Sequence, residues 1–111
     1  ATTNLVQFAL NSSGSEANVD SNTTINDGSY HFLCLIRTGN QSEAFIDLVS
    51  KGTADCTGYN TDKAIPLEIG NKAGQASRAS SGTFGEALIY NRALTAAEIL
   101  HIYLATKWRY Q

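Results

Sequence analysis

The sequence has little charge, one proline, two cysteines and no methionine. Charged residues make up 16% of the 111 residues, against about 25% in typical globular domains, and Ser, Thr and Asn take their place. The single proline excludes collagen and Pro-rich linkers. A hydrophobic content of 42% argues against wholesale disorder. The length predicts a single domain with one core.

Basic clusters and long apolar runs are also missing, and each absence excludes a class of partner. The net charge is −2, and the nearest approach to a basic cluster is Lys107-Trp108-Arg109. Nucleic-acid binding needs a basic stripe that releases counterions, so we expect no nucleic-acid partner. No stretch approaches the roughly 18 apolar residues of a membrane-spanning helix, so we expect no membrane partner.

The cysteines, Cys34 and Cys56, are too few for a disulfide scaffold and lack the spacing of a zinc site. A bridge between them is one reading. Two small buried hydrophobic residues are the other, and the strand pattern favours it, because it places Cys34 in mid-strand and two strands away from Cys56.

Alternating apolar residues and frequent turn signals predict short strands along most of the chain. In the first strand, residues 5–10, Val6, Phe8 and Leu10 share one face. We expect further strands at 16–19, 23–25, 30–37, 43–49, 65–69 and 83–91, with loops at 50–61 (containing a short strand) and 71–82. Many short strands separated by turns are typical of a sandwich or jelly roll.

The last segment changes to a helical period. Thr95 and Glu98 form a capping-box pattern, and Leu94 and Ile99 occupy the staple positions around it, so we expect a helix over 95–107. Four apolar residues then fall at i, i+3, i+4 and i+8, which predicts a buried face: Leu100, Tyr103, Leu104 and Trp108. We expect Trp108 in the core and His101 facing solvent.

Residues 82–98, GTFGEALIYNRALTAAE, resemble the closing motif of laminin-G-like, concanavalin A-like jelly rolls. Weaker resemblances lie at 28–33, 44–47 and 69–71, and the tail YLATKW at 103–108 resembles bacterial and bacteriophage members. The resemblance implies an all-β, antiparallel jelly-roll sandwich with one C-terminal α-helix. It also implies structural roles for the matching residues and the helix that follows them: Phe84, Glu86, Tyr90, Arg92, Leu94, Thr95, Glu98 and Trp108.

The sequence departs from this family in two ways. Leu48 follows Asp47 where members usually have Asp-Gly, and the chain shows fewer strands than a full sandwich, with residues 1–26 atypical. We therefore expect a shortened jelly roll, a C-terminal piece, or a fold completed by neighbouring chains. An unpaired sheet edge invites pairing with another chain, so we expect a homo-oligomer with residues 1–26 near the contact.

No catalytic constellation is visible, and we expect no enzyme activity. Related glucanases carry two carboxylates as E-x-D-x-E, whereas here Leu88 and Tyr90 follow Glu86. We expect Glu86 to tie its strand to Arg92 or to loop amides. His31 and Cys34 are three residues apart on a strand and therefore point to opposite faces.

The polar loops supply the remaining candidate site. Four loop acids are scattered without a calcium-binding run, so we expect no cofactor, with calcium as the alternative: Asp20, Asp27, Asp55 and Asp62. The loop 58–62 offers a ring, an amide and a carboxylate, the mix that binds sugars on this fold. The candidate glycan-binding residues are Tyr59, Asn60, Asp62 and Asp27; the alternative for Tyr59 is packing under its own loop.

Together these features predict a non-catalytic recognition or structural module. We expect it at a virion surface, as a tail-fibre or head-decoration domain, or otherwise in an extracellular setting, binding a glycan or neighbouring subunits. One alternative is a secreted bacterial carbohydrate-binding or adhesion module, and another is a fragment of a glycoside hydrolase. Fold resemblance alone does not decide among them.

Overall fold

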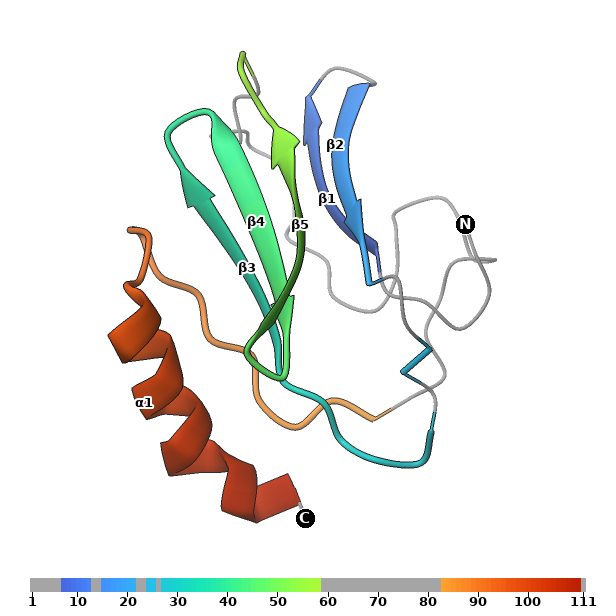
Figure 1. Ribbon diagram of the computed structural model, residues 1–111, viewed down its shortest axis with the longest axis vertical. Helices are drawn as coiled ribbons and strands as arrows, with labels where there is room; N and C mark the ends of the chain where they lie inside the picture. The colour runs from blue at the N-terminus through green and yellow to red at the C-terminus, as the bar shows by residue number, and fades with distance from the viewer. Residues whose placement is uncertain (1–6, 13–14, 22–23, 26, 59–82, 111) are drawn as a thin grey trace.

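The computed structural model describes residues 7–12, 15–21, 24–25, 27–58 and 83–110, and in this part the chain forms two antiparallel sheets and a C-terminal helix (Figure 1). The elements follow the order β1 (Gln7–Ser12), β2 (Ser15–Asp20), β3 (Leu33–Thr38), β4 (Gln41–Ile46), β5 (Val49–Asp55), α1 (Ala96–Thr106) and the 3₁₀ turn η2 (Lys107–Tyr110). This arrangement confirms the antiparallel strands and the single helix. A complete jelly-roll sandwich is not seen in the described residues.

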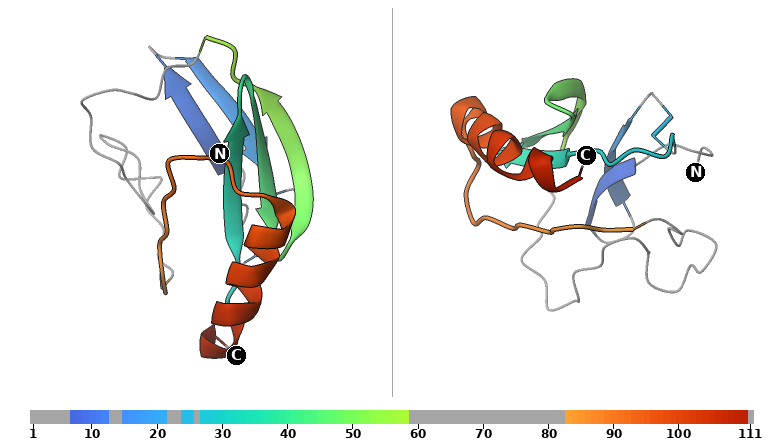
Figure 2. Two further views of the ribbon diagram at one scale, coloured as in Figure 1. Left: turned by 90° about the vertical axis from the view of Figure 1, so that its left-hand side faces the viewer. Right: turned by 90° about the horizontal axis from the view of Figure 1, so that it is seen from below.

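Strands β2 and β5 contact each other and so bring the two sheets together. Figures 1 and 2 show the two sheets next to each other. A register shift beside Ala44 leaves Lys51 as an extra residue in β5, which is a β-bulge. The next residue, Gly52, has φ 134°, and a Cβ there would lie 3.7 Å from Val19 Cγ1. Glycine thus accommodates the positive φ at the bulge, whereas the spacing to β2 is an ordinary van der Waals distance.

The core is built mainly from small side chains. Residues 42, 44 and 46 alternate onto one face of β4 and are buried, as period-2 geometry requires. The other buried side chains are Ala17, Val19, Ser21, Cys56 and Ile99. Both cysteines are free, as the strand pattern favoured. Burial raises the pKa of the half-buried Cys34 thiol.

Helix α1 begins at the capping box that the sequence predicts. Thr95 Oγ1 accepts from the Glu98 amide at 3.2 Å, and Glu98 Oε1 accepts from the Thr95 amide at 2.9 Å. Leu94 is half-buried, and Ile99 is 5% exposed. No helix in the described part of the chain has the length and apolar character to span a bilayer.

The predicted buried face of α1 is wrong in three of its four positions. Ile99 is buried instead, and the Tyr103 ring meets Phe32 edge-on at 5.5 Å. The three exposed side chains are Leu100 (44%), Leu104 (51%) and Trp108 (65%). Because α1 carries two adjacent apolar stripes, helical periodicity alone does not select the one that packs on the sheet.

The strand expected at 83–91 is also wrong. Residues 83–90 form no strand, and every side chain of this stretch is exposed. A strand is completed by hydrogen bonds to a neighbour, and no strand in the described ranges pairs with this segment. Thr24 and Ile25 form no strand either, while the elements expected at 65–69 and 71–82 lie outside the described residues.

The single strand expected at 43–49 is in fact interrupted by a turn. Strand β4 ends at Ile46, and β5 begins at Val49 and runs to Asp55. For residues 50–61 we expected a loop with only a short strand. Between them Asp47 (φ 50°) and Leu48 (φ 70°) both lie in the left-handed region, as a two-residue hairpin turn requires. Leucine rarely adopts this conformation, so the sequence carried no strong signal for the turn.

Candidate functional site

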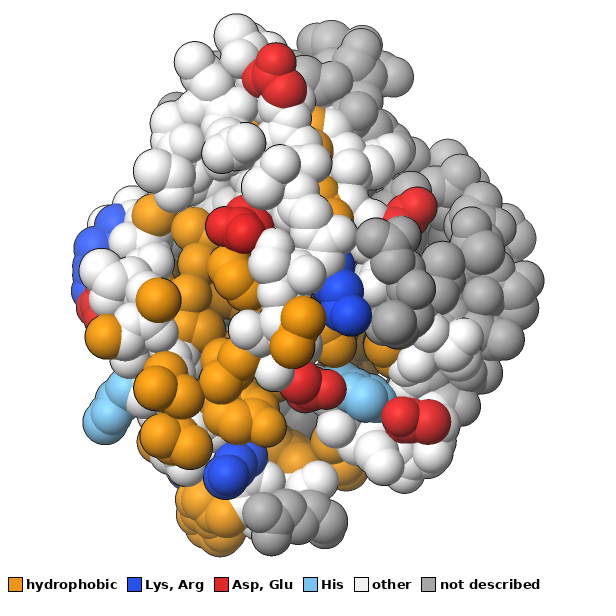
Figure 3. All heavy atoms as spheres, viewed as in Figure 1, with side chains coloured by type: hydrophobic (Ala, Val, Ile, Leu, Met, Phe, Trp, Pro, Cys, Tyr) orange, Lys and Arg blue, Asp and Glu red, His pale blue; other side chains and the backbone are white. Residues whose placement is uncertain are grey.

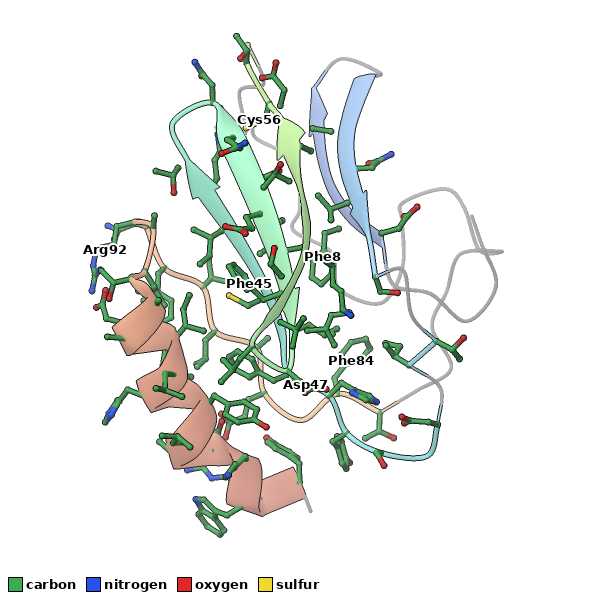
Figure 4. All side chains as sticks on the ribbon, in the orientation of Figure 1. Phe8, Phe45, Asp47, Cys56, Phe84 and Arg92 are labelled. Atoms are coloured by element: carbon green, nitrogen blue, oxygen red, sulfur yellow. The ribbon has the colours of Figure 1, made fainter. Side chains whose placement is uncertain are left out.

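His31 lies between two carboxylates at the end of the sheet that carries the β4–β5 turn. Its Nδ1 is 2.7 Å from Asp47 Oδ2, and its Nε2 is 2.9 Å from Asp27 Oδ1. Figure 4 labels Asp47 at this end, and Figure 3 shows a histidine ring flanked by acidic side chains. We refer to Asp27, His31 and Asp47 as the histidine–aspartate cluster.

The hairpin holds Asp47 firmly in this cluster. Its Oδ1 accepts a hydrogen bond from the Phe32 amide at 3.0 Å. Its own amide donates to the Phe32 carbonyl at 2.9 Å, which extends the β3–β4 ladder by one step. Asp47 is therefore a fixed acceptor whose position follows from the hairpin register.

Asp27 is held more loosely. Its Oδ1 accepts from the Ser29 amide at 3.0 Å, an Asx turn that Gly28 completes with φ 83°. The Asp27 side chain is 51% exposed. Among the described residues the hydrogen bonds to Asp27 all reach Oδ1, from the Ser29 amide and from His31.

The cluster favours a protonated His31. Hydrogen bonds to Asp47 and then to Asp27 raise the pKa of His31 above its ordinary value near 6.5. The His31 contact, followed by the Ser29 amide, lowers the pKa of Asp27. With one imidazolium between two carboxylates, the cluster carries a net negative charge.

An exposed aromatic ring lies next to the cluster in the chain. Tyr30 is 50% exposed, and its ring packs on Tyr110 with centroids 4.9 Å apart and planes tilted by 46°. Tyr110 in turn lies so close to Gly85 that any Cβ there would clash with its ring. The loop before β3, the segment 83–90 and η2 therefore meet at Tyr110.

The structure places only one of the four predicted glycan residues in this site. Asp27 belongs to the cluster, whereas Tyr59, Asn60 and Asp62 lie outside the described residues. Asp55 Oδ1 caps a turn by accepting from the Thr57 hydroxyl at 2.5 Å and from the Thr57 amide at 2.9 Å, and these two bonds lower the pKa of Asp55.

Sequence reasoning missed the pairing of His31 with two aspartates. The spacing of Asp27 and His31, four residues apart along the chain, was a usable local signal. The contact to Asp47, 16 residues away, was not visible before the hairpin register was known.

No metal centre is apparent in the described ranges, where no three His, Cys, Asp or Glu side chains are grouped to hold an ion. The two nitrogens of His31 face different carboxylates, so the ligand atoms of the cluster do not converge on one point. The cluster is therefore suited to hydrogen bonding rather than to metal coordination.

The charged residues of the closing motif make structural pairs. Arg92 binds Glu98 in a bidentate pair at 2.8 and 2.5 Å, which together with the Thr95 amide lowers the pKa of Glu98 to about 2. Glu86 pairs with Arg109, whereas the Arg92 that we expected as its partner binds Glu98; the amides of the loop 71–82 lie outside the described residues. The ion pair of Glu86 and Arg109 fixes η2 against the segment 83–90.

Comparison with known proteins gives one family. The family model of the concanavalin A-like lectin/glucanases superfamily matches residues 1–100. No curated protein matches. Among solved structures, the chain is similar to a crystal structure of an S-layer domain-containing protein from Clostridium thermocellum, with 19% identity and a TM-score of 0.48. The similarity covers 88% of this chain and 51% of that chain, so this chain spans about half of its length.

Proposed function

The chain belongs to the concanavalin A-like lectin/glucanases superfamily, and from this premise we propose that it is a non-catalytic module that binds a glycan at Asp27, Tyr30 and His31. The observation that carries the proposal is that an exposed aromatic ring, Tyr30, and an exposed carboxylate, Asp27, lie on the same loop before β3. These are the aromatic and acidic groups that the sequence led us to look for, found on a different loop.

The geometry suits a sugar in two ways. The exposed part of the Tyr30 ring offers an apolar surface to the CH-rich face of a pyranose, and its contact with Tyr110 limits ring motion. Asp27 Oδ2 can accept a hydroxyl hydrogen bond, and such charge-assisted bonds are stronger than neutral ones. A few well-placed polar groups beside an apolar surface are typical of small-molecule recognition.

Charge narrows the class of glycan. Two carboxylates and one imidazolium leave the cluster negative even when His31 is protonated. A neutral or amino sugar fits this field, whereas a sialic or uronic acid would meet repulsion. We therefore propose neutral or amino sugars as ligands.

A glycan array tests the proposal, followed by calorimetry with the strongest ligand. Tyr30→Ala should weaken binding by roughly three- to tenfold, the value of one aromatic contact, and Tyr30→Phe should restore it. Trp108→Ala is the matched control, because it removes another exposed aromatic side chain outside the site. Absence of binding on the array, or equal losses in Tyr30→Ala and Trp108→Ala, would contradict the proposal.

For the setting of the module we propose a virion or other extracellular surface, with a tail-fibre or head-decoration domain as the specific case. Family membership supports recognition outside a cell, and the resemblance of residues 103–108 to bacteriophage and bacterial members supports the virion. The rivals are a secreted bacterial adhesion module and a glycoside hydrolase fragment. Sequencing the gene upstream of the Ala1 codon separates these settings, because it distinguishes a free chain from a fragment of a larger protein.

We also propose that the protein is a homo-oligomer or part of a larger particle, with residues 1–26 near the contact. Within the described residues β1 pairs only with β2, so its other edge is available to a second chain. Light scattering and hydrogen exchange on β1 test this. A monodisperse monomer with a protected β1 would contradict it.

A further inference from the structure

His31 is bonded to an acceptor through each of its ring nitrogens. A neutral imidazole has one N–H donor and one lone pair, whereas the imidazolium has two donors. Both partners are carboxylates, which only accept. The observed pair of contacts is therefore complete only while His31 carries a proton on each nitrogen.

We propose that His31 is a positioning residue that holds Asp27 in its ligand-binding place only while it is protonated, so that the site weakens as the pH rises. The part that concerns ligand affinity rests on the proposed function. The part that concerns the order of the loop 27–31 stands on the geometry of the cluster alone.

Asp27 is the partner that would be released. Asp47 keeps its bonds to Phe32 whatever the state of His31, and the neutral ring can still donate from Nδ1 to Asp47. Nε2 would then present a lone pair to Asp27 Oδ1, and two acceptors 2.9 Å apart repel. Asp27 lies on an exposed loop and keeps only the Ser29 amide, so the loop moves rather than the hairpin.

The charges around His31 set the direction of this switch. Asp47 faces it from the β4–β5 turn and Asp27 from its own loop, and these two carboxylates are the described groups whose charge acts on it. Because they raise the pKa of His31, the cluster is complete at and below about pH 6.5 and is lost as the pH rises through the raised pKa. The switch therefore lies above pH 6.5, the ordinary pKa of histidine.

A ligand-free NMR titration tests the geometric part. The chain has two histidines, and His101 on α1 supplies a second, exposed ring outside the cluster. We expect His31 to titrate above 6.5, with the Ser29 amide following the same midpoint and hydrogen exchange at 27–31 rising above it. A His31 midpoint at or below 6.5, or a Ser29 amide that ignores it, would overturn the proposal.

Binding of the strongest array glycan across pH tests the coupling. From about pH 5.5 to about pH 8.5 the wild-type affinity should fall roughly fivefold or more. His31→Gln should bind with a flat profile, because its amide does not titrate, and His101→Gln should follow the wild type. A flat wild-type profile, or a dependence that survives in His31→Gln, would overturn the coupling.

The two arms separate the proposals. If no glycan binds at any pH, the proposed function and the coupling both fail, while the NMR arm still decides whether the proton orders the loop. If glycan binds without pH dependence, the function stands and the inference fails. Because the NMR arm uses the wild-type chain, it does not depend on the folding of a variant.

Discussion

The hairpin of β3 and β4 and the segment 83–90 are both rich in strand-compatible apolar residues but end in different structures. The hairpin closes through the turn at Gly39 (φ 60°), and its partner strand follows at once along the chain. The segment has no partner strand in the described ranges, and all of its side chains are exposed. Such residues show that a segment is compatible with a sheet, and a neighbour of matching register is needed to complete it.

The largest expected change in the free energy of unfolding comes from comparing one isoleucine in each of the two regions. Ile46 in β4 is 5% exposed, whereas Ile89 in the segment is 71% exposed. Ile46→Ala should lower the free energy of unfolding by about 2–5 kcal/mol, as for large-to-small core changes. Ile89→Ala should change it by less than about 0.5 kcal/mol.

Denaturant unfolding of both variants checks this pair. Similar losses would mean that the segment is buried against a partner in solution. That result would restore the strand predicted at 83–91.

Loss of the capping box at the start of α1 should give the next largest loss of stability. Thr95→Ala should destabilise the protein by about 1 kcal/mol, because the Glu98 amide loses its acceptor. Thr106→Ala is the control on the same helix, since that hydroxyl only bonds back to the Ile102 carbonyl at 2.8 Å and should contribute little. Thermal unfolding of the two variants should differ; equal melting temperatures would count against the cap.

Acid should destabilise the start of α1 by less than the loss of the Thr95 cap does, because solvent screens the exposed ion pair of Arg92 and Glu98. The pKa of Glu98 is lowered from 4.5 to about 2. Its stabilising effect is therefore present above about pH 4.5 and is lost as the pH falls toward 2. Melting temperature against pH should fall in this range, and Glu98→Gln should flatten the fall. An unchanged acid profile in Glu98→Gln would contradict this assignment.

The smallest change in stability is expected when Trp108 is replaced by alanine. Its ring is 65% exposed, and its Nε1 donates to the Ala105 carbonyl at 2.8 Å. Trp108→Ala should therefore change stability by about 0.5 kcal/mol or less, rather than the roughly 3–5 kcal/mol of a core aromatic. A loss as large as that of Ile46→Ala would show that Trp108 is buried in solution.

Local signals predicted the parts of the fold that local physics decides. The capping box at Thr95 and the hairpin at Gly39 each depend on a few neighbouring residues, and both formed. The buried face of α1 was not predictable, because Ile99 and Leu100 belong to adjacent apolar stripes and only the sheet chooses between them. The turn at Leu48 was missed because its conformation is unusual for leucine.

The candidate site also has one part that the sequence predicted and one part that it did not. Asp27 was selected from the sequence as a loop carboxylate, and the structure places it against His31. The contact of His31 with Asp47 depends on the register of the hairpin, which a one-residue shift would change. The cluster was therefore visible only once the strands were paired.

Chemical-shift mapping of the wild-type chain with the strongest array glycan tests the central claim most directly. The account predicts that the largest amide shifts fall at residues 27–32 and at Asp47, the loop and turn that form the cluster. Largest shifts along 100–108 instead, or no shifts with any glycan that the array selects, would contradict it.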